Sequence, residues 1–455
     1  MVDDHCARRP DSALARLLPR SRQRTTVTSS RLRLNPWRTW PTLHRGVSEE
    51  THGLEQLGQD TSEADARHPP VWQLTRAAGL TTGVWGSLHS WPPPPSSETV
   101  PFHVPDVFAP SAEAEPSSLV PFQDLVLRMA RRSARNVDRR VAGRETLRFL
   151  ASAPFQGLRL GTMTGLTGQL LAERRQSWKR TRRRSWHPRL GFDLFHEQLR
   201  RHRPRFATFH TNHVAAAMHR YWAAAFPDDF DRCGYSAEWQ RRYAGEITDA
   251  MDHLDVMLDQ LFRSSERDGT VVVITGSMGQ AAASPDPIRT QLYLTDVDRF
   301  AARLGLSSDD WSLRPAMAPR VSLSVVGHHV SDLLARLNTL RIAGTPVEVE
   351  SPGESFVNLC FGQRDLDPAT EQATLDGKPV PFAELGLENV KVEDESGQSG
   401  DHVAEGIFIV VDPAAEPCAD RDELQLTEIA PWILDRLGVE RPAHLLRAVG
   451  AQAGG

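Results

Sequence analysis

Lysine, cysteine and long apolar runs are scarce in this chain of 455 residues. Nearly all of the positive charge is arginine, because lysine occurs only as Lys179, Lys378 and Lys391. No CxxC pair is present, which excludes a zinc ribbon and a CxxC redox motif; the cysteines are Cys6, Cys233, Cys360 and Cys418. No apolar run reaches the ~18–20 residues that cross a bilayer. We therefore expect a cytoplasmic protein with reduced cysteines and no membrane partner; two disulfides are the alternative.

The charge of the chain is close to balanced, with a formal net charge of −5. This value argues against nucleic acid as a partner of the whole protein, because such binding needs concentrated positive charge. Residues 173–184 nevertheless carry seven basic side chains. They are either an anion or nucleic-acid patch or a solvated helix face. The acidic stretch 383–430 is either solvated surface or a cation-binding segment.

Several segments alternate between helix and strand patterns. Residues 71–79 have the spacing of a short helix that stops at Gly79, and the β-leaning sequence LTTGVWGSL follows. Helical patterns also cover 121–150, 192–203, 237–264 and 426–439. The runs 205–211, 271–275 and 406–413 predict strands, of which VVVIT (271–275) is expected to be buried on both faces. Helix and strand in alternation predict an α/β fold with a parallel sheet.

The two remaining regions differ from this pattern. Residues 1–30 show neither a helix nor a strand period, so we expect them to be irregular. Residues 340–395 contain short strand and turn patterns, which predict a small β-rich insertion or cap. The predicted organisation is thus an α/β core of residues 31–339 and 396–446, interrupted by a cap at 340–395.

Three places combine nucleophile or ligand side chains with loop positions. The first is Thr39-Trp40-Pro41-Thr42 with Thr51-His52-Gly53-Leu54 behind it. The second runs from Thr211 to Trp222 and contains two histidines. The third is GSMGQ (276–280) after the VVVIT strand, joined later in the chain by Asp401-His402-Val403-Ala404-Glu405-Gly406. Ligands of open α/β sheets bind at the carboxyl ends of strands, which is where GSMGQ lies.

The order of these motifs resembles the alkaline phosphatase superfamily, in particular its nucleotide pyrophosphatase/phosphodiesterase branch. Thr39-Trp40-Pro41-Thr42 looks like the Thr-Phe-Pro-Asn motif of that branch, and 51–54 looks like its Ser-His-Gly-Ile/Val. His219 stands at the His of its Asp-x-x-x-His motif. His402 precedes a Gly and a strand, and IAPWIL (429–434) matches the family's last helix. The resemblance covers roughly 36–440 and implies a doubly wound, mostly parallel sheet with helices on both faces.

The resemblance also implies a reaction, hydrolysis of a phosphate ester by a threonine nucleophile between two metal ions, usually zinc. Thr39 would be the nucleophile, and His219 and His402 would be metal ligands. His213 and Asp401 are neighbours that could complete a metal site, and Arg38, Arg45 and Ser277 are expected to bind phosphate. For Thr39 the alternative role is a helix N-cap, which threonine favours.

The chain departs from the family's ligand set at three positions. Gly276-Ser277 stand where the family has Asp-His, and Ala215 stands four residues before His219 where the family has Asp. The first metal-binding Asp of the family ends an N-terminal apolar strand, and no such strand is evident before residue 30; a truncated N-terminus would explain that loss alone. We therefore expect a site for zinc or another divalent metal that lacks several ligands.

Two classes of function follow from these observations. The chain is either a phosphodiesterase/nucleotide pyrophosphatase-like hydrolase, or a non-catalytic descendant (a pseudoenzyme) that uses the same cleft for binding. A metal-poor phosphotransferase using the same pocket is a third interpretation. The expected ligand in each case is a phosphorylated small molecule or a nucleotide-like compound.

Overall fold

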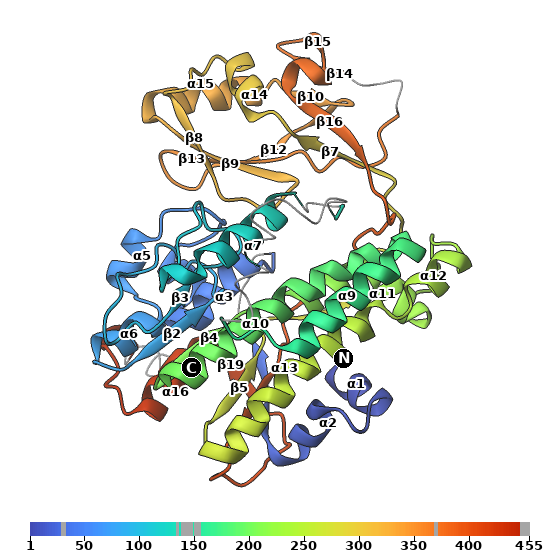
Figure 1. Ribbon diagram of the computed structural model, residues 1–455. Coiled ribbons are helices and arrows are strands. Elements are labelled where there is room, and N and C mark those ends of the chain that lie inside the picture. The colour runs from blue at the N-terminus through green and yellow to red at the C-terminus, as the bar shows by residue number, and fades with distance from the viewer. Residues whose placement is uncertain (29–32, 133–135, 138–148, 150–155, 368–371, 446–455) are drawn as a thin grey trace.

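The computed structural model describes residues 1–28, 33–132, 136–137, 149, 156–367 and 372–445 (Figure 1). Its helices and strands form a mixed α/β protein, as predicted. The helices outside the cap are α1 (Val2–Arg8), α2 (Ala13–Leu17), α3 (Pro36–Arg45), α4 (Glu49–His52), α5 (Ser62–Arg67), α6 (Val71–Ala77), α7 (Val120–Arg132), α9 (Leu160–Arg175), α10 (Arg183–His202), α11 (His213–Ala225), α12 (Ala237–Tyr243), α13 (Glu246–Asp268) and α16 (Ile429–Leu437). Of the helix expected at 121–150, residues 121–132 are helical in α7, and residues 133–135, 138–148 and 150 lie outside the described residues.

The core contains two sheets of three or four strands and a two-stranded ribbon of β6 (Gly279–Ala282) and β17 (Gly400–Val403). One has the order β19-β1-β18-β5, in which β1 runs parallel to β19 and antiparallel to β18, and β18 runs antiparallel to β5. The other has the order β3-β2-β4, and both of its pairings are parallel. The bounds are β1 (Arg22–Val27), β2 (Thr82–Trp85), β3 (His103–Val104), β4 (Phe206–Phe209), β5 (Val272–Thr275), β18 (Phe408–Val411) and β19 (Glu423–Gln425).

The N-terminal region is regular, contrary to the expectation of an irregular segment 1–30. Helix α2 packs the side chains of Leu14 and Leu17 into the same apolar cluster as Leu258 of α13. Its first turn is capped by Asp255, whose carboxylate accepts from the backbone N–H groups of Ala13 and Leu14 at 2.9 and 2.8 Å. Strand β1 follows. Its sequence RQRTTV has no apolar run, and backbone pairing on both edges holds the strand in place.

Two other predictions need correction. The single helix expected at 237–264 is two helices, α12 and α13, which are separated at 244–245. Strand β5 is only half buried rather than buried on both faces, because within the described sheet it lies at the edge and pairs with β18 alone. The strand at 406–413 and the helix at 426–439 agree with prediction: all four residues of β18 are buried, and Gly438 ends α16 at φ +69°.

The cap is larger than predicted and begins near residue 290 rather than at 340. Strand β7 (Thr290–Leu294) pairs antiparallel with β16 (Leu387–Lys391), so the entry and exit strands of the unit lie side by side. Between them lie α14 (Val297–Arg303), β8 (Trp311–Arg314), β9 (Arg320–Val325), α15 (Gly327–Leu337), β10 (Arg341–Ile342), β11 (Thr345–Pro346), β12 (Glu348–Glu350), β13 (Phe356–Cys360), β14 (Gln372–Leu375) and β15 (Lys378–Pro381).

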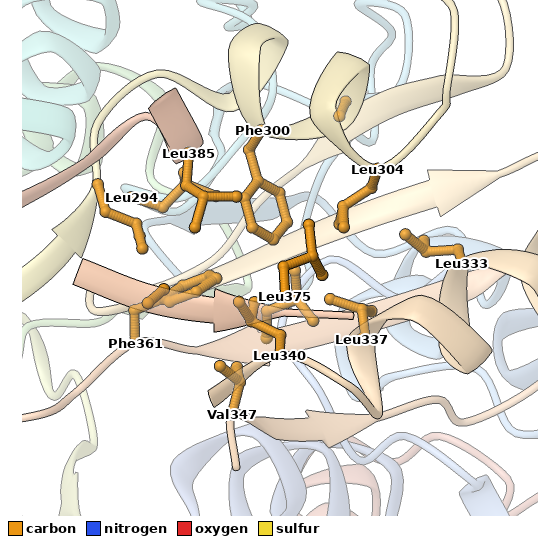
Figure 2. Packing of buried hydrophobic residues seen from close by; sticks show 14 of the residues in the cluster. Leu294, Phe300, Leu304, Leu333, Leu337, Leu340, Val347, Phe361, Leu375 and Leu385 are labelled. Atoms are coloured by element: carbon orange, nitrogen blue, oxygen red, sulfur yellow. The ribbon is translucent and has the colours of Figure 1, made fainter. Parts of the chain in front are cut away.

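The cap has its own apolar core, which explains its extent. Figure 2 shows Phe300 of α14 and Leu333 and Leu337 of α15 directed toward the same centre as Phe361 and Leu375. Because residues from 292 to 387 share this cluster, the segment before 340 belongs to the cap. It stands above the core in Figure 1, and its described residues include helices α14 and α15, so the cap is an α/β unit rather than the β-rich one expected.

Three of the seven basic side chains in segment 173–184 form ion pairs with acidic side chains of the same molecule. Arg182 contacts Glu246 at 2.7 Å and Asp249 at 2.9 Å, and Arg183 pairs with Glu173. Arg180 lies 2.9 Å from Glu393 of the acidic stretch. These arginines join α9 and α10 to α13 and to the chain that returns from the cap, so at these three positions the segment has a structural role.

Two further sequence observations concern cysteines and membranes. Cys6, Cys233, Cys360 and Cys418 are all described, and each is a free thiol. In the part of the chain that the structure describes, every helix is too short or too polar to cross a bilayer.

Candidate functional site

The candidate nucleophile lies in the first turn of α3. Asn35 is the N-cap of this helix, and its side chain accepts from the backbone N–H of Trp37 at 2.8 Å. Pro36 follows at the first helical position, where its missing N–H costs nothing. Thr39 is therefore not the N-cap, because Asn35 holds that position four residues earlier. Its own N–H already donates to the carbonyl of Asn35 at 3.1 Å.

The hydroxyl of Thr39 contacts Ser277, although 238 residues separate the two in sequence. The two Oγ atoms are 3.0 Å apart, and Thr39 Oγ1 also lies 3.3 Å from the Asn35 carbonyl oxygen. A hydroxyl has one proton, so when Thr39 donates it to the carbonyl, the bond between the hydroxyls is donated by Ser277. Thr39 is 2% exposed. Its hydroxyl is thus held by neutral partners and is closed to solvent.

Ser277 follows β5 in a loop that the ends of β1 and β18 hold in place. Thr26 Oγ1 donates to the carbonyl of Gly276 at 2.7 Å, and Gly276 N–H donates to Ile407 at 2.9 Å. Gly406 lies so close that a Cβ there would stand 2.4 Å from Thr26 Oγ1. The absence of a side chain at 406 therefore allows the three segments to meet at the carboxyl end of β5.

The two predicted metal ligands lie against each other. The ring centroids of His219 and His402 are 4.8 Å apart with the ring planes at 87°. His219 lies on α11, and His402 lies on β17 (Gly400–Val403), which pairs antiparallel with β6 (Gly279–Ala282). The close packing of α11 on this ribbon depends on Gly400, because a Cβ there would stand 2.6 Å from the Met218 carbonyl oxygen.

Each of these imidazoles has a further fixed contact. His219 Nδ1 is 2.7 Å from the carbonyl oxygen of Gly400, so this nitrogen carries a proton and donates it. The ring of His402 meets the backbone of Leu34, next to the α3 N-cap, and its Nδ1 lies 3.6 Å from Asp401 Oδ1. Burial lowers the pKa of His219 to about 4 and also lowers the pKa of His402. Both rings are therefore neutral at neutral pH.

His213 does not join this pair, contrary to its predicted role as a supporting ligand. Its Nε2 donates to the carbonyl of Ala250 on α13 at 3.0 Å, and its Nδ1 lies 2.8 Å from Thr211 Oγ1. Both nitrogens are used inside the protein, and the residue is 2% exposed. Six positions along α11 turn the side chain away from the face that carries His219. His213 fastens α11 to α13.

The two arginines expected to bind phosphate differ in availability. Among the described residues the Arg38 side chain makes one hydrogen bond, from Nη2 to Glu55 at 3.1 Å, and its buried Nε has no partner there. Arg45 is 1% exposed and is fully committed: Nη2 donates to Asp65 Oδ1 and Nη1 to the His68 carbonyl, both at 2.6 Å. Arg45 is consequently a structural residue, and the prediction that it binds phosphate is wrong.

The Thr-His-Gly motif at 51–54 also has a structural role. The backbone N–H of Leu54 donates to His52 Nδ1 at 3.0 Å, so His52 Nε2 carries the proton and donates to Thr42 Oγ1 at 3.1 Å. Burial lowers the pKa of His52 to about 4, which keeps the ring neutral. His52 thereby fixes the loop after α4 against α3.

The residues that the structure describes do not assemble a site for a pair of zinc ions. A zinc ion in a protein takes three or four N, S or O ligands at ~2.0–2.3 Å. In the described part of the chain, no group of three or more His, Cys, Asp or Glu side chains is arranged to hold a metal. Strand β1 does end near the site, but Val27 is followed by Thr28 where the resemblance places an aspartate. We therefore derive no chemistry from metal ions.

Sequence reasoning missed several polar groups at this edge of the sheet. Gln280 is the cross-strand partner of His402, and its Oε1 is buried with no partner among the described residues, as is Oγ1 of Thr275. Leu34, next to the α3 N-cap Asn35, joins this helix to the histidine pair through its backbone contact with His402. The loop position of GSMGQ is the one signal that could have indicated Gln280.

One continuous cleft is lined by Asn35, Arg38, Ser277, His219 and His402, and it extends between core and cap. Its volume of about 2880 Å³ exceeds the roughly 300–1,000 Å³ of a small-molecule pocket, so the side chains rather than the volume define the candidate site. Thr39 is not among the lining residues; it contacts the cleft through Ser277.

No protein-family model matches the chain, and no curated protein matches it. Among solved structures it is similar to murine ectonucleotide pyrophosphatase/phosphodiesterase 5, with 11% identity over 96% of this chain and 93% of that one and a TM-score of 0.39. The human protein has 12% identity over 94% of this chain and 90% of that one, with a TM-score of 0.37. Phosphonoacetate hydrolase from Sinorhizobium meliloti has 16% identity over 96% of this chain and 92% of that one, with a TM-score of 0.42. TM-scores this low leave function to be argued from the site itself.

Proposed function

We propose that this chain is a phosphodiesterase/nucleotide pyrophosphatase-like protein of the alkaline phosphatase superfamily whose cleft binds a phosphorylated small molecule without two-metal hydrolysis. One observation carries the proposal. Residues picked from motif order alone, in four distant segments, gather at one edge of the sheet: Thr39 contacts Ser277, and His219 contacts His402. The two pairs are linked where His402 meets Leu34 next to the α3 N-cap.

The N-terminal end of α3 supports an anion as the ligand. The dipole of α3, a helix of ten residues, favours negative charge at this end. Its first N–H groups are already used, because Pro36 has none and those of Trp37 and Arg38 donate to Asn35, so arginine side chains must supply the donors. Arg33 and Arg38 both line the cleft there, and the buried Nε of Arg38 is a donor without a partner among the described residues. A phosphate group supplies the acceptor oxygens that such donors need.

The surroundings of Thr39 support binding rather than catalysis. A threonine nucleophile needs a base or a metal to take its proton and needs open access to phosphorus. The nearest partners of the Thr39 hydroxyl are a carbonyl and another hydroxyl, which are poor bases, and the residue is 2% exposed. Two neutral imidazoles without a third described ligand do not replace a dizinc centre.

The proposal predicts binding without turnover. In the purified protein we expect no stoichiometric zinc by elemental analysis, no hydrolysis of an aryl phosphodiester, and a rise in melting temperature with AMP or inorganic phosphate. Arg38→Met is expected to weaken binding roughly 10- to 100-fold, because it removes charge-assisted hydrogen bonds. Arg303→Met, on α14 of the cap, is the matched control and is expected to bind normally.

Two other results would replace this proposal. About two zinc ions per chain, with chelator-sensitive hydrolysis that Thr39→Ala abolishes, would show a classical enzyme. Metal-independent turnover that Thr39→Ala abolishes would show a metal-poor phosphotransferase. If neither AMP nor phosphate shifts the melting temperature and no turnover is seen, the cleft does not recognise phosphate.

A further inference from the structure

The ribbon of β6 and β17 presents an unusual set of polar groups to α11. Gln280 and His402 are direct cross-strand partners, so their side chains leave the same face of the ribbon. On α11, the residues they meet are Ala215 and His219, which are one turn apart on one helix face. These side chains and Ala215 all line the cleft.

The orientation of the Gln280 amide is fixed by its neighbour. The Ala215 carbonyl can only accept, so the amide nitrogen must face it, and Nε2 donates at 3.3 Å. Oε1 is left buried without a donor among the described residues. A buried carbonyl oxygen without a hydrogen bond destabilises the protein, and a donor on a bound ligand would remove that cost.

The proton of His219 is fixed in the same way. Since Nδ1 donates to the Gly400 carbonyl at 2.7 Å, the neutral ring keeps its lone pair on Nε2. No hydrogen bond to Nε2 is seen in the described part of the chain. Gln280 Oε1 and His219 Nε2 are thus two acceptors on residues that line the same cleft, and Asp401, 3.6 Å from His402, adds negative charge to that lining. Such a place disfavours phosphate and favours hydroxyl or N–H donors.

From this arrangement we infer that the α11/β6–β17 face binds the hydroxyl-bearing part of a phosphorylated polyol, such as a sugar or cyclitol phosphate. The inference rests on the proposed function, because the phosphate is held at the other end, at the α3 N-terminus with Arg38. His402 joins the two ends, since its ring contacts both His219 and the backbone of Leu34. The ligand then meets donors with its phosphate and acceptors with its hydroxyls.

A matched pair of ligands tests the inference by calorimetry. Inositol 1-phosphate and cyclohexyl phosphate share a six-membered ring and a phosphate monoester, and only the first carries ring hydroxyls. We expect the wild-type protein to bind inositol 1-phosphate about tenfold more tightly, the equivalent of one buried hydrogen bond. Gln280→Leu is expected to abolish this preference while leaving cyclohexyl phosphate binding unchanged.

Gln260→Leu is the matched control. Gln260 also has a buried Oε1 without a partner among the described residues, but it lies on α13 and does not line the cleft, so the preference is expected to persist. Equal binding of both compounds overturns the inference and leaves phosphate recognition intact, whereas binding of neither overturns the proposed function as well. A preference that survives Gln280→Leu, or that a chelator removes, also overturns it. Should Gln280→Leu not fold, the wild-type comparison decides.

Discussion

Acidification from pH 7 to 5.5 is expected to lower the free energy of unfolding by several kcal/mol. The cause is a set of buried imidazoles that stay neutral in the folded protein. Burial lowers the pKa to about 4 for His52, His187, His210, His219 and His253, and to about 3 for His89, His103 and His213. After unfolding, each ring titrates near its ordinary value of 6.5.

The direction of this effect follows from proton uptake. Between pH 6.5 and about 4 these imidazoles bind protons in the unfolded chain but stay neutral in the folded one. The free energy of unfolding therefore falls as the pH falls. Each ring contributes about 1 kcal/mol at pH 5.5. Asp106 and Asp249 act in the opposite direction, because burial raises their pKa to about 6 and they take up protons in the folded state first. The imidazoles outnumber them.

Urea unfolding at constant ionic strength across this pH range measures the effect. His187→Leu is expected to make the dependence on pH shallower, because the variant lacks one buried ring that resists protonation. His328→Leu, on the exposed surface of the cap, is the matched control. Unfolding free energies that stay constant from pH 7 to 5.5 would contradict the burial of these histidines.

Sequence patterns predicted the elements whose burial is strong and local. Strand β18 is four buried apolar residues, and helix α16 ends at a glycine, so composition alone indicated both. Strand β1 was missed because its place depends on backbone pairing to β18 and β19, which arrive about 400 residues later. The start of the cap was missed for a similar reason: β7 is defined by its partner β16 and by a core shared with distant residues.

For the candidate site, too, sequence reasoning succeeded at some residues and failed at others. The order of motifs selected His219 and His402, which do meet, and Ser277, which contacts Thr39. Residue type near a motif did not reveal side-chain direction, and for that reason His213 and Arg45 were misassigned. The GSMGQ motif includes Gln280, but sequence alone did not single this residue out, because only the structure shows that its amide nitrogen bonds Ala215 and leaves Oε1 without a partner among the described residues.

The buried ion pair of Arg45 is the second place where a large effect is expected. Asp65→Leu leaves the guanidinium 1% exposed and without its carboxylate, and we expect it to lower the free energy of unfolding by about 3–5 kcal/mol. Arg45→Met is expected to cost less, about 1–3 kcal/mol, because the Asp65 side chain is 27% exposed and keeps a hydrogen bond from Thr61.

The double variant Asp65→Leu/Arg45→Met distinguishes a structural pair from a ligand site. Replacing both members of a buried ion pair by apolar side chains is often nearly neutral, so the double variant is expected to be more stable than Asp65→Leu alone. Urea unfolding at pH 7 gives the three free energies, and calorimetry with inorganic phosphate gives the affinities. Because Arg45 is turned to Asp65 and His68, the folded variants should bind phosphate as the wild type does, unlike Arg38→Met. If Arg45→Met lost phosphate binding while its free energy of unfolding stayed unchanged, Arg45 would be a phosphate-binding residue as first predicted.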